Sequence, residues 1–232
     1  MIFLLLSICS STLIFLLFRS FPGWGVETLP AIVVNYITAF VCGMFLIQGP
    51  YDYAERMSQP WFMAAALMGC LFIVLFYLMA RTSQTLGVSA ASIATKMSLV
   101  IPVAWFMLTD PLDEVTGFKL VAVVLAIPGV ILSSRKPKTG KFNWRLLLLP
   151  LIIFTGSGVI DIIIGSFSSS SILISQNDQF LFTSAPFLTA AVLGTLFILV
   201  QAGNGKVRFN RMTLLAGIVL GAVNFSSIYF LV

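Results

Sequence analysis

Long apolar runs recur along this chain, and short polar segments separate them. A transmembrane helix needs about 20 predominantly apolar residues, with a range of roughly 17–25, to cross the hydrocarbon core. The runs therefore predict an all-α, polytopic transmembrane helix bundle with eight spans. No Lys or Arg precedes the first run, so we interpret it as a retained span and not as a signal peptide. The predicted spans are residues 2–18, 29–47, 61–80, 88–108, 117–132, 146–165, 180–200 and 212–232.

Composition supports a lipid environment and limits the chemistry. Apolar residues make up 59% of the 232 residues and charged residues 9%, whereas soluble domains have about 45–50% and about 25%. The chain has no His, which excludes His-ligated metal sites and nucleophiles activated by imidazole. Cys9, Cys42 and Cys70 lie in apolar runs without a C-x-x-C pair, and we interpret them as packing residues. We predict no enzymatic activity, no cofactor and no metal.

The basic residues fall mostly on one side of the predicted membrane. If successive loops alternate between compartments, the even-numbered loops hold only Arg56 and Lys119. The positive-inside rule then places the odd-numbered loops in the cytoplasm and both termini outside, in a multi-pass protein of the cell (inner) membrane. The net charge of +5 accordingly indicates topology and anionic lipid, not nucleic acid. The odd loops hold Arg19, Arg81, Arg135, Lys136, Lys138, Lys141, Arg145, Lys206, Arg208 and Arg211; the acidic residues of the far side are Asp52, Glu55, Asp110, Asp113, Glu114 and Asp178.

Two pairs of spans repeat with the same spacing. The second and seventh spans begin 151 residues apart, and so do the third and eighth. Gly69 precedes Tyr77 by eight residues in the third span, as Gly221 precedes Tyr229 in the eighth. This offset predicts a five-span unit in residues 1–134 and an incomplete, inverted unit in residues 146–232. Because the second unit lacks counterparts of spans four and five, we expect a C-terminally truncated ten-helix protein; a natural eight-helix protein is the alternative.

Two ionisable side chains lie inside predicted spans, Lys96 in the fourth and Asp161 in the sixth. Each would cost about 2.5–3.5 kcal/mol on the insertion scale if it faced hydrocarbon, so both should face the bundle interior. Lys96 is a candidate counter-charge for an anionic or zwitterionic substrate. Asp161 is a candidate proton-coupling carboxylate or a ligand for a substrate amine. The alternative for both is a structural role, in which carbonyls or hydroxyls hold the charge.

Other polar residues extend this candidate substrate pathway. Ser92 lies one helical turn before Lys96, and Pro102 predicts a break in the same helix. Ser157 lies among small residues of the sixth span, which allow close helix packing or leave room for a ligand. The amides of the second and eighth spans and the tyrosines of the third and eighth complete the set, although the tyrosines also suit the membrane interface. These residues are Asn35, Asn224, Tyr77 and Tyr229.

Residues 80–134 resemble the closing part of an EamA-type repeat of the drug/metabolite transporter superfamily. The resemblance rests on VSAASIATKMSLVIP at 88–102, an acidic turn, and LAIPGVIL at 125–132. The turn reads TDPLDE at 109–114 and does not keep the Gly-Glu of the family. TGSGVID at 155–161 is similar to the start of the second repeat in some bacterial members. The resemblance extends over the whole chain in plan.

The resemblance implies a ten-helix carrier of two inverted five-helix repeats. Such carriers move small metabolites by alternating access through a central cavity, often as exporters, and the cavity here would be lined from spans two, three, four, six and eight. Many members have cytoplasmic termini, whereas the loop charges of this chain predict the reverse. The expected partners are a small-molecule substrate and the lipid bilayer, with a homodimer left open. The alternative function is a non-transporting membrane subunit in which Lys96 and Asp161 bind helices of a partner protein.

Overall fold

The computed structural model describes residues 2–110, 116–133, 144–168, 175–203 and 210–229. All regular structure in these residues is helical, as predicted, and no strand occurs among them. The elements are α1 (Ile2–Ser20), the short 3-10 helix η1 (Phe21–Trp24), α2 (Thr28–Met44), α3 (Tyr53–Met57), α4 (Pro60–Thr85), α5 (Val88–Met97), α6 (Val100–Thr109), α7 (Gly117–Ser133), α8 (Trp144–Ser168), α9 (Gln176–Gly203) and α10 (Arg211–Tyr229).

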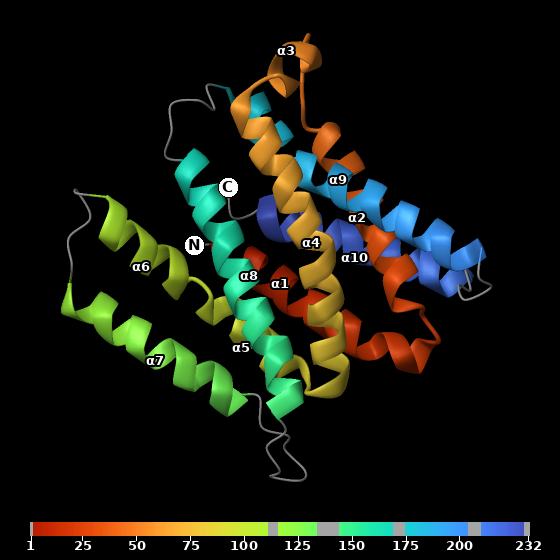
Figure 1. Ribbon diagram of the computed structural model, residues 1–232. Coiled ribbons are helices and arrows are strands. Elements are labelled where there is room, and N and C mark those ends of the chain that lie inside the picture. The colour runs from red at the N-terminus through yellow and green to blue at the C-terminus, as the bar shows by residue number, and fades with distance from the viewer. Residues whose placement is uncertain (1, 111–115, 134–143, 169–174, 204–209, 230–232) are drawn as a thin grey trace.

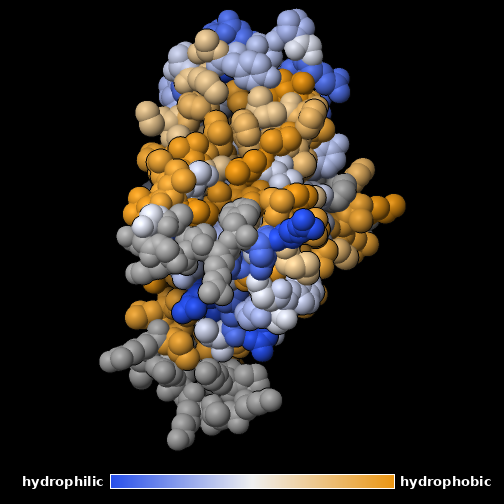
Figure 2. Space-filling model, turned by 90° about the vertical axis from the view of Figure 1, so that its right-hand side faces the viewer, coloured by the Kyte–Doolittle hydropathy of each residue, from blue (hydrophilic) through white to orange (hydrophobic). Residues whose placement is uncertain are grey.

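Six helical segments of the described chain are long and apolar enough to cross a membrane. They are residues 5–24, 60–85, 88–109, 146–167, 176–201 and 211–229. α2 and α7 are also apolar but have 17 residues each. The chain is therefore a helical bundle with the character of a multi-pass membrane protein. Figure 2 shows the corresponding surface, a broad zone of hydrophobic side chains with hydrophilic side chains gathered at the upper end and again in the lower part.

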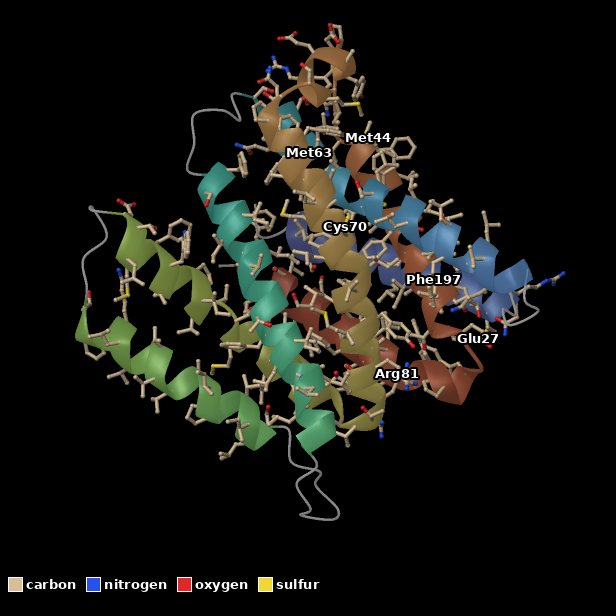
Figure 3. All side chains as sticks on the ribbon, viewed as in Figure 1. Glu27, Met44, Met63, Cys70, Arg81 and Phe197 are labelled. Carbon is tan, nitrogen blue, oxygen red and sulfur yellow. The ribbon has the colours of Figure 1, made fainter. Side chains whose placement is uncertain are left out.

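The centre of the bundle is formed by α2 and α9, which pack along each other. α10 packs on α2 and α4 packs on α9, while α1 lies against α10 and α8 against α4. α5, α6 and α7 also pack on α8, and α6 and α7 lie at the left of Figure 1. Phe18, Tyr36 and Phe187 are fully buried in the core, whereas Met63 and Phe197 project from the outer surfaces of α4 and α9 (Figure 3).

Hydrogen bonds tie the loops of each end of the bundle to one another. At one end Asn210 Nδ2 donates to the Gly25 carbonyl at 3.0 Å, and Gln84 Nε2 donates to Thr28 Oγ1 at 3.0 Å. At the other end Asn177 Nδ2 donates to the Gln48 carbonyl at 2.9 Å. The odd-numbered loops one, three and seven therefore meet at one end, and loops two and six meet at the other. Of the predicted odd-loop cations, those at 135, 136, 138, 141, 206 and 208 lie outside the described residues.

The predicted break in the fourth span is present, and it divides the span into α5 and α6, separated by Ser98 and Leu99. The structure differs from the predicted elements in two other places. The loop after α2 contains the short helix α3, which begins where Asp52 accepts hydrogen bonds from the backbone N–H groups of residues 54 and 55. Asp178, which we placed in a loop, lies in the first turn of α9 because that helix begins at Gln176.

Candidate functional site

A break in a membrane-length helix forms the centre of the candidate site. α5 ends at Met97 and α6 begins at Val100, so the backbone changes helix at Ser98. Pro102 has no N–H group and cannot donate to the Ser98 carbonyl four residues earlier. Ile101 N donates to that carbonyl instead, at 2.9 Å. A hydrogen bond between residues three apart therefore replaces the α-helical bond between residues four apart. In the resulting turn, the Ser98 side chain lies against α8.

Asp161 of α8 lies at this break. Its Oδ2 atom is 3.3 Å from Ser98 Oγ, and Ser98 is completely buried. Ser98 Oγ also lies 2.6 Å from the Thr95 carbonyl oxygen, to which it donates a hydrogen bond. The carboxyl group of α8, the hydroxyl at the break and the last turn of α5 thus form one polar cluster between otherwise apolar helices.

Ser157 lies one turn before Asp161 on the same helix. It is 7% exposed, and its Oγ atom has no hydrogen-bond partner among the described residues. The glycines on either side allow close contacts: a Cβ on Gly156 would lie 2.6 Å from a methyl carbon of Leu75 in α4, and one on Gly158 would lie 2.5 Å from a methyl carbon of Ile101 in α6. Close packing of α4 and α6 on α8 therefore keeps the Ser157 hydroxyl away from solvent.

Lys96 and Ser92 lie on α5, beside this cluster. The Lys96 side chain is exposed and Ser92 is half-buried. Lys96 and Asp161 are the basic and the acidic side chain of this region. No ion pair within 4.0 Å joins the two side chains; the ion pair found among the described residues is that of Arg56 and Asp178. The structure therefore brings Ser98, and not Lys96, into contact with Asp161.

The other predicted residues lie elsewhere in the bundle. Asn35 of α2 and Asn224 of α10 are buried, and their side-chain amides face each other at 3.2 Å. Tyr77 and Tyr229 are exposed, and the Tyr229 ring stacks on Phe225. The predicted residues thus divide into a group at the break of α5 and α6, a pair of amides at the contact of α2 with α10, and two exposed tyrosines on α4 and α10.

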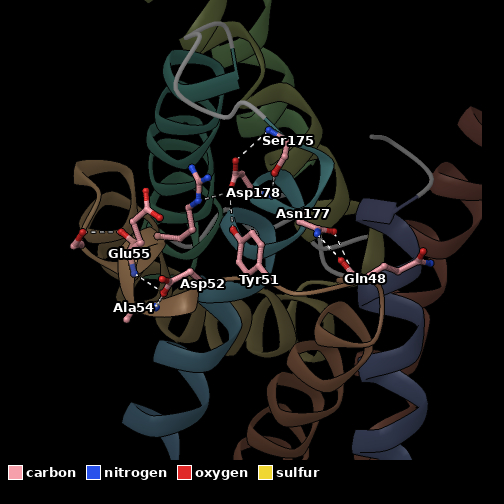
Figure 4. Close-up of polar contacts among 10 residues, drawn as sticks. Gln48, Tyr51, Asp52, Ala54, Glu55, Ser175, Asn177 and Asp178 are labelled. Atoms are coloured by element: carbon pink, nitrogen blue, oxygen red, sulfur yellow. Dashed lines mark hydrogen bonds and ion pairs between the residues drawn. The ribbon is translucent and has the colours of Figure 1, made fainter.

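A second polar cluster, which the sequence did not predict, joins the loop before α4 to the start of α9 (Figure 4). Asp178 is completely buried; Tyr51 donates a 2.6 Å hydrogen bond to its Oδ1 atom, and Arg56 Nε lies 3.5 Å from the same atom. Ser175 and Asp178 bond reciprocally through their side chains and backbone N–H groups, each at 3.1 Å. The Ser-x-x-Asp spacing is that of a capping box, which was the readable signal.

Burial, and the hydrogen bond to Asp178, raise the pKa of Tyr51 well above its usual value. The phenol therefore remains a hydrogen-bond donor across the physiological range. With Asn177 bonded to Gln48 beside it, this cluster fixes the loop between α2 and α4 to the first turn of α9. Each of these side chains has a specific hydrogen-bond partner, so the cluster holds the loops together at this end of the bundle.

The described surface includes two apolar hollows. One of about 290 Å³ lies between α6, α7 and α8, and one of about 330 Å³ lies between α2 and α9. Both are lined almost entirely by apolar side chains, and neither includes Lys96 or Asp161. Among the described residues, no three His, Cys, Asp or Glu side chains are grouped as metal ligands.

Comparison with known proteins provides one relative. No protein-family model matches the chain, and no solved structure matches it. An uncharacterized protein of Haemophilus influenzae is 28% identical to this chain over 210 residues. The aligned region covers 86% of this chain and 67% of the relative. About a third of the relative therefore lies outside the region that the two proteins share.

Proposed function

We propose that the chain is a membrane carrier of a small metabolite, an EamA-like member of the drug/metabolite transporter superfamily that works by alternating access and exports its substrate. The proposal includes eight spans, arranged as two inverted repeats. The observation that carries it is a set of matched close contacts between helices that lie 151 or 152 residues apart in the chain. A fold built from two equivalent inverted halves is the arrangement that lets a carrier open alternately to either side.

The first matched contact is between α4 and α9. A Cβ atom on Gly69 would lie 2.5 Å from the Pro186 carbonyl oxygen and 2.5 Å from Thr189 Cβ. Only a residue without a side chain fits at this distance. The crossing of α4 on α9 therefore depends on Gly69.

The contact between α10 and α2 has the same composition. A Cβ atom on Gly221 would lie 2.6 Å from the Asn35 carbonyl oxygen and 2.6 Å from Thr38 Cβ. Asn35 and Thr38 correspond to positions 186 and 189 with an offset of 151 residues. Gly221 corresponds to position 69 with an offset of 152. The two crossings are thus equivalent residue by residue, which favours two repeats related by a pseudo-twofold axis.

A second pair of glycines follows the same relation. Gly43 of α2 packs against Ser184 of α9, and a Cβ on it would lie 3.3 Å from the Phe225 ring of α10. The same offsets give the counterparts of these three residues. Gly43 corresponds to position 194 and Ser184 to position 33, each with an offset of 151, and Phe225 corresponds to position 73 with an offset of 152. A Cβ on the glycine at 194 would lie 2.5 Å from methyl carbons of Val33 and Ile73. Between these crossings the rings of positions 36 and 187, also 151 apart, stack on each other at 6.1 Å.

The loop contacts support opposite directions for the two halves. The start of α2 is bonded to the start of α10, where Glu27 N donates to Thr213 Oγ1 at 3.1 Å. The end of α2 is bonded to the start of α9 through Gln48 and Asn177. α2 therefore runs from one end of the bundle to the other although it has 17 residues, and α9 runs the opposite way. This supports counting α2 as a span.

Labelling of single cysteines tests the orientation. After Cys9, Cys42 and Cys70 are replaced by Ser, Ser58→Cys places an exposed thiol in the second loop, and Thr85→Cys places one at the third. We expect a membrane-impermeant maleimide to label Ser58→Cys in intact cells and Thr85→Cys only after permeabilisation. The reverse pattern would refute the charge-based orientation, and labelling of both in intact cells would refute the alternation of loops.

Analysis of the medium tests the transport activity. Cells that express the chain are expected to release at least one small metabolite faster than cells with an empty vector, as measured by mass spectrometry. Equal release of every metabolite would refute the carrier proposal. Copurification of a partner protein in fixed stoichiometry, together with equal release, would favour the membrane-subunit alternative.

A further inference from the structure

The Asp161 carboxylate has few polar contacts for a charged group among apolar helices. Among the described residues, the hydrogen bond found at this carboxylate comes from Ser98 Oγ, which donates to Oδ2 at 3.3 Å. The same hydroxyl donates to the Thr95 carbonyl oxygen at 2.6 Å, so one proton is shared between two acceptors. The two oxygens of a carboxylate offer about four lone-pair sites, and Ser98 therefore satisfies only a small part of them.

The negative charge of Asp161 also lacks an ion-pair partner. The Lys96 side chain is exposed on α5, and no ion pair within 4.0 Å joins it to Asp161. Ionisable residues inside membrane spans are generally paired with one another or with backbone groups, because an isolated charge there is costly. The geometry therefore favours a further cation beside this carboxylate.

Ser157 provides a second oxygen atom on the same face of α8. Its side chain is buried, and its Oγ atom has no hydrogen-bond partner among the described residues. Gly156 packs on α4 and Gly158 packs on α6, so Ser157 faces the space between these two helices, where α5 also packs on α8. Asp161 lies one turn further on, with its Cβ atom about 5–6 Å from that of Ser157, so their oxygens can converge on one ion.

The end of α5 makes this space favourable for a positive charge. α5 ends at Met97, and the last carbonyl groups of a helix have no N–H partner within it. Their partial charges give a helix C-terminus a negative potential. In membrane carriers, the C-terminal ends of broken helices are where Na⁺ is coordinated.

We propose that the break between α5 and α6 binds one monovalent cation of the size of Na⁺. Its ligands are a carboxylate oxygen of Asp161 and the hydroxyl oxygens of Ser98 and Ser157, which keep lone pairs while their protons are donated elsewhere. One carboxylate among neutral oxygens is neutralised by a single positive charge, whereas Ca²⁺ sites gain affinity from further charged ligands. Such a site needs neither His nor Cys, so the composition of the chain does not exclude it.

This inference deepens the proposed carrier, because it names a coupling ion, and that role rests on the carrier proposal. Ser98 belongs to the first unit and Asp161 to the second, so a shared ion would join the two units where they meet. Binding of the ion can nevertheless be measured without transport.

Equilibrium binding of radioactive Na⁺ to the purified full chain tests the site. The chain is held in micelles of an uncharged detergent, and choline chloride keeps the ionic strength constant. We expect saturable binding of about one ion per chain, which Asp161→Asn abolishes and which the exposed-carboxylate control Glu55→Gln keeps. Unchanged binding in Asp161→Asn, or no saturable binding by the wild type, would overturn the proposal.

Two serine variants keep the carboxylate and test the ligand set. Ser157→Ala removes one oxygen ligand, so the dissociation constant for Na⁺ should rise about tenfold, comparable to the loss of a hydrogen bond to a charged group. Ser184→Ala is the matched control, because Ser184 is also buried but donates its hydroxyl proton to the Phe180 carbonyl of its own helix. Equal dissociation constants for the two variants would overturn the assigned ligands, even if Asp161→Asn fails to fold.

Lys96→Gln tests the electrostatics of the site. The Lys96 ammonium repels a second cation nearby, so its removal should lower the dissociation constant for Na⁺. Weaker binding in Lys96→Gln would contradict this arrangement.

The outcomes separate this inference from the carrier proposal. Sodium binding that depends on Asp161, without any exported metabolite, supports the site and refutes the carrier. Export by a chain that shows no saturable sodium binding refutes the site and leaves the carrier proposal standing.

Discussion

The close crossing of α4 on α9 makes Gly69 sensitive to one added carbon. A Cβ atom there would lie 2.5 Å from the Pro186 carbonyl oxygen, whereas favourable C···O contacts are about 3.3–3.6 Å. The carbonyl belongs to a helix backbone and cannot rotate away, so the helices must separate by about 1 Å. Overpacking of this kind costs about 1–3 kcal/mol. We therefore predict that Gly69→Ala destabilises the protein.

Gly129 of α7 provides the matched control. It also lies within a helix, but a Cβ there would meet only the flexible end of Met97 at 4.0 Å. Gly129→Ala should be neutral or stabilising by about 0.5–1 kcal/mol, because alanine is the better helix former. The difference in thermal midpoint between the two variants measures the free-energy cost of adding a Cβ atom where α4 crosses α9. For a chain of this size, 1 kcal/mol shifts the midpoint of thermal unfolding by about 2–4 °C, so the midpoint of Gly69→Ala should be clearly lower than that of Gly129→Ala.

The assay is loss of helical circular dichroism on heating the purified chain in detergent micelles. Gly221→Ala should behave as Gly69→Ala does, because its Cβ would lie 2.6 Å from the Asn35 carbonyl oxygen. If either variant unfolds at the same temperature as Gly129→Ala, the close crossings are not as described. If only one of the pair is destabilised, the equivalence of the two crossings, and with it the argument for repeats, fails.

Three further predictions concern the polar contacts. The pKa of Tyr51 is raised above its usual 10.0, so its hydrogen bond stabilises the fold below about pH 10 and is lost at higher pH; the stability advantage of wild type over Tyr51→Phe, measured as thermal midpoints against pH, should disappear in that range. Asn224→Leu leaves the Asn35 amide without its 3.2 Å partner and should cost about 1–3 kcal/mol in thermal unfolding, whereas adding Asn35→Leu should recover part of the loss. Pro102→Ala restores an N–H group, so one more slowly exchanging amide is expected at position 102 in hydrogen exchange.

Sequence predicted the helical character of the chain because lipid leaves the backbone few choices. In hydrocarbon every N–H and C=O group must be bonded within the chain, so a long apolar run folds as a helix whatever its neighbours are. Local chemistry also predicted features within helices. Pro102 indicated a break in the fourth span, and the backbone changes helix at Ser98, four residues before it. These features depend on residues that are adjacent in sequence.

The candidate site could be predicted only in part, because its contacts join distant residues. Asp161 was conspicuous as a charge in an apolar run, but Ser98, its contact, is 63 residues away. Nothing distinguished Ser98 from other serines, which in helices commonly bond their own backbone. Lys96 was the more prominent residue, yet helix rotation leaves it exposed beside the cluster. Which face of α5 meets α8 is decided by the packing of these two helices on each other, and sequence does not reveal that.

Three side-chain contacts of the bundle join the same two parts of the chain. Ser98 with Asp161, Tyr51 with Asp178 and Asn35 with Asn224 each join the first 134 residues to those after residue 145. Apolar helices in lipid can slide with little change in energy, whereas a buried hydrogen bond requires one particular partner. If the two units rock against each other during transport, these contacts must break or change partner. A hydrogen bond between membrane helices averages only about 0.6 kcal/mol, so each of these contacts would oppose such a movement only weakly.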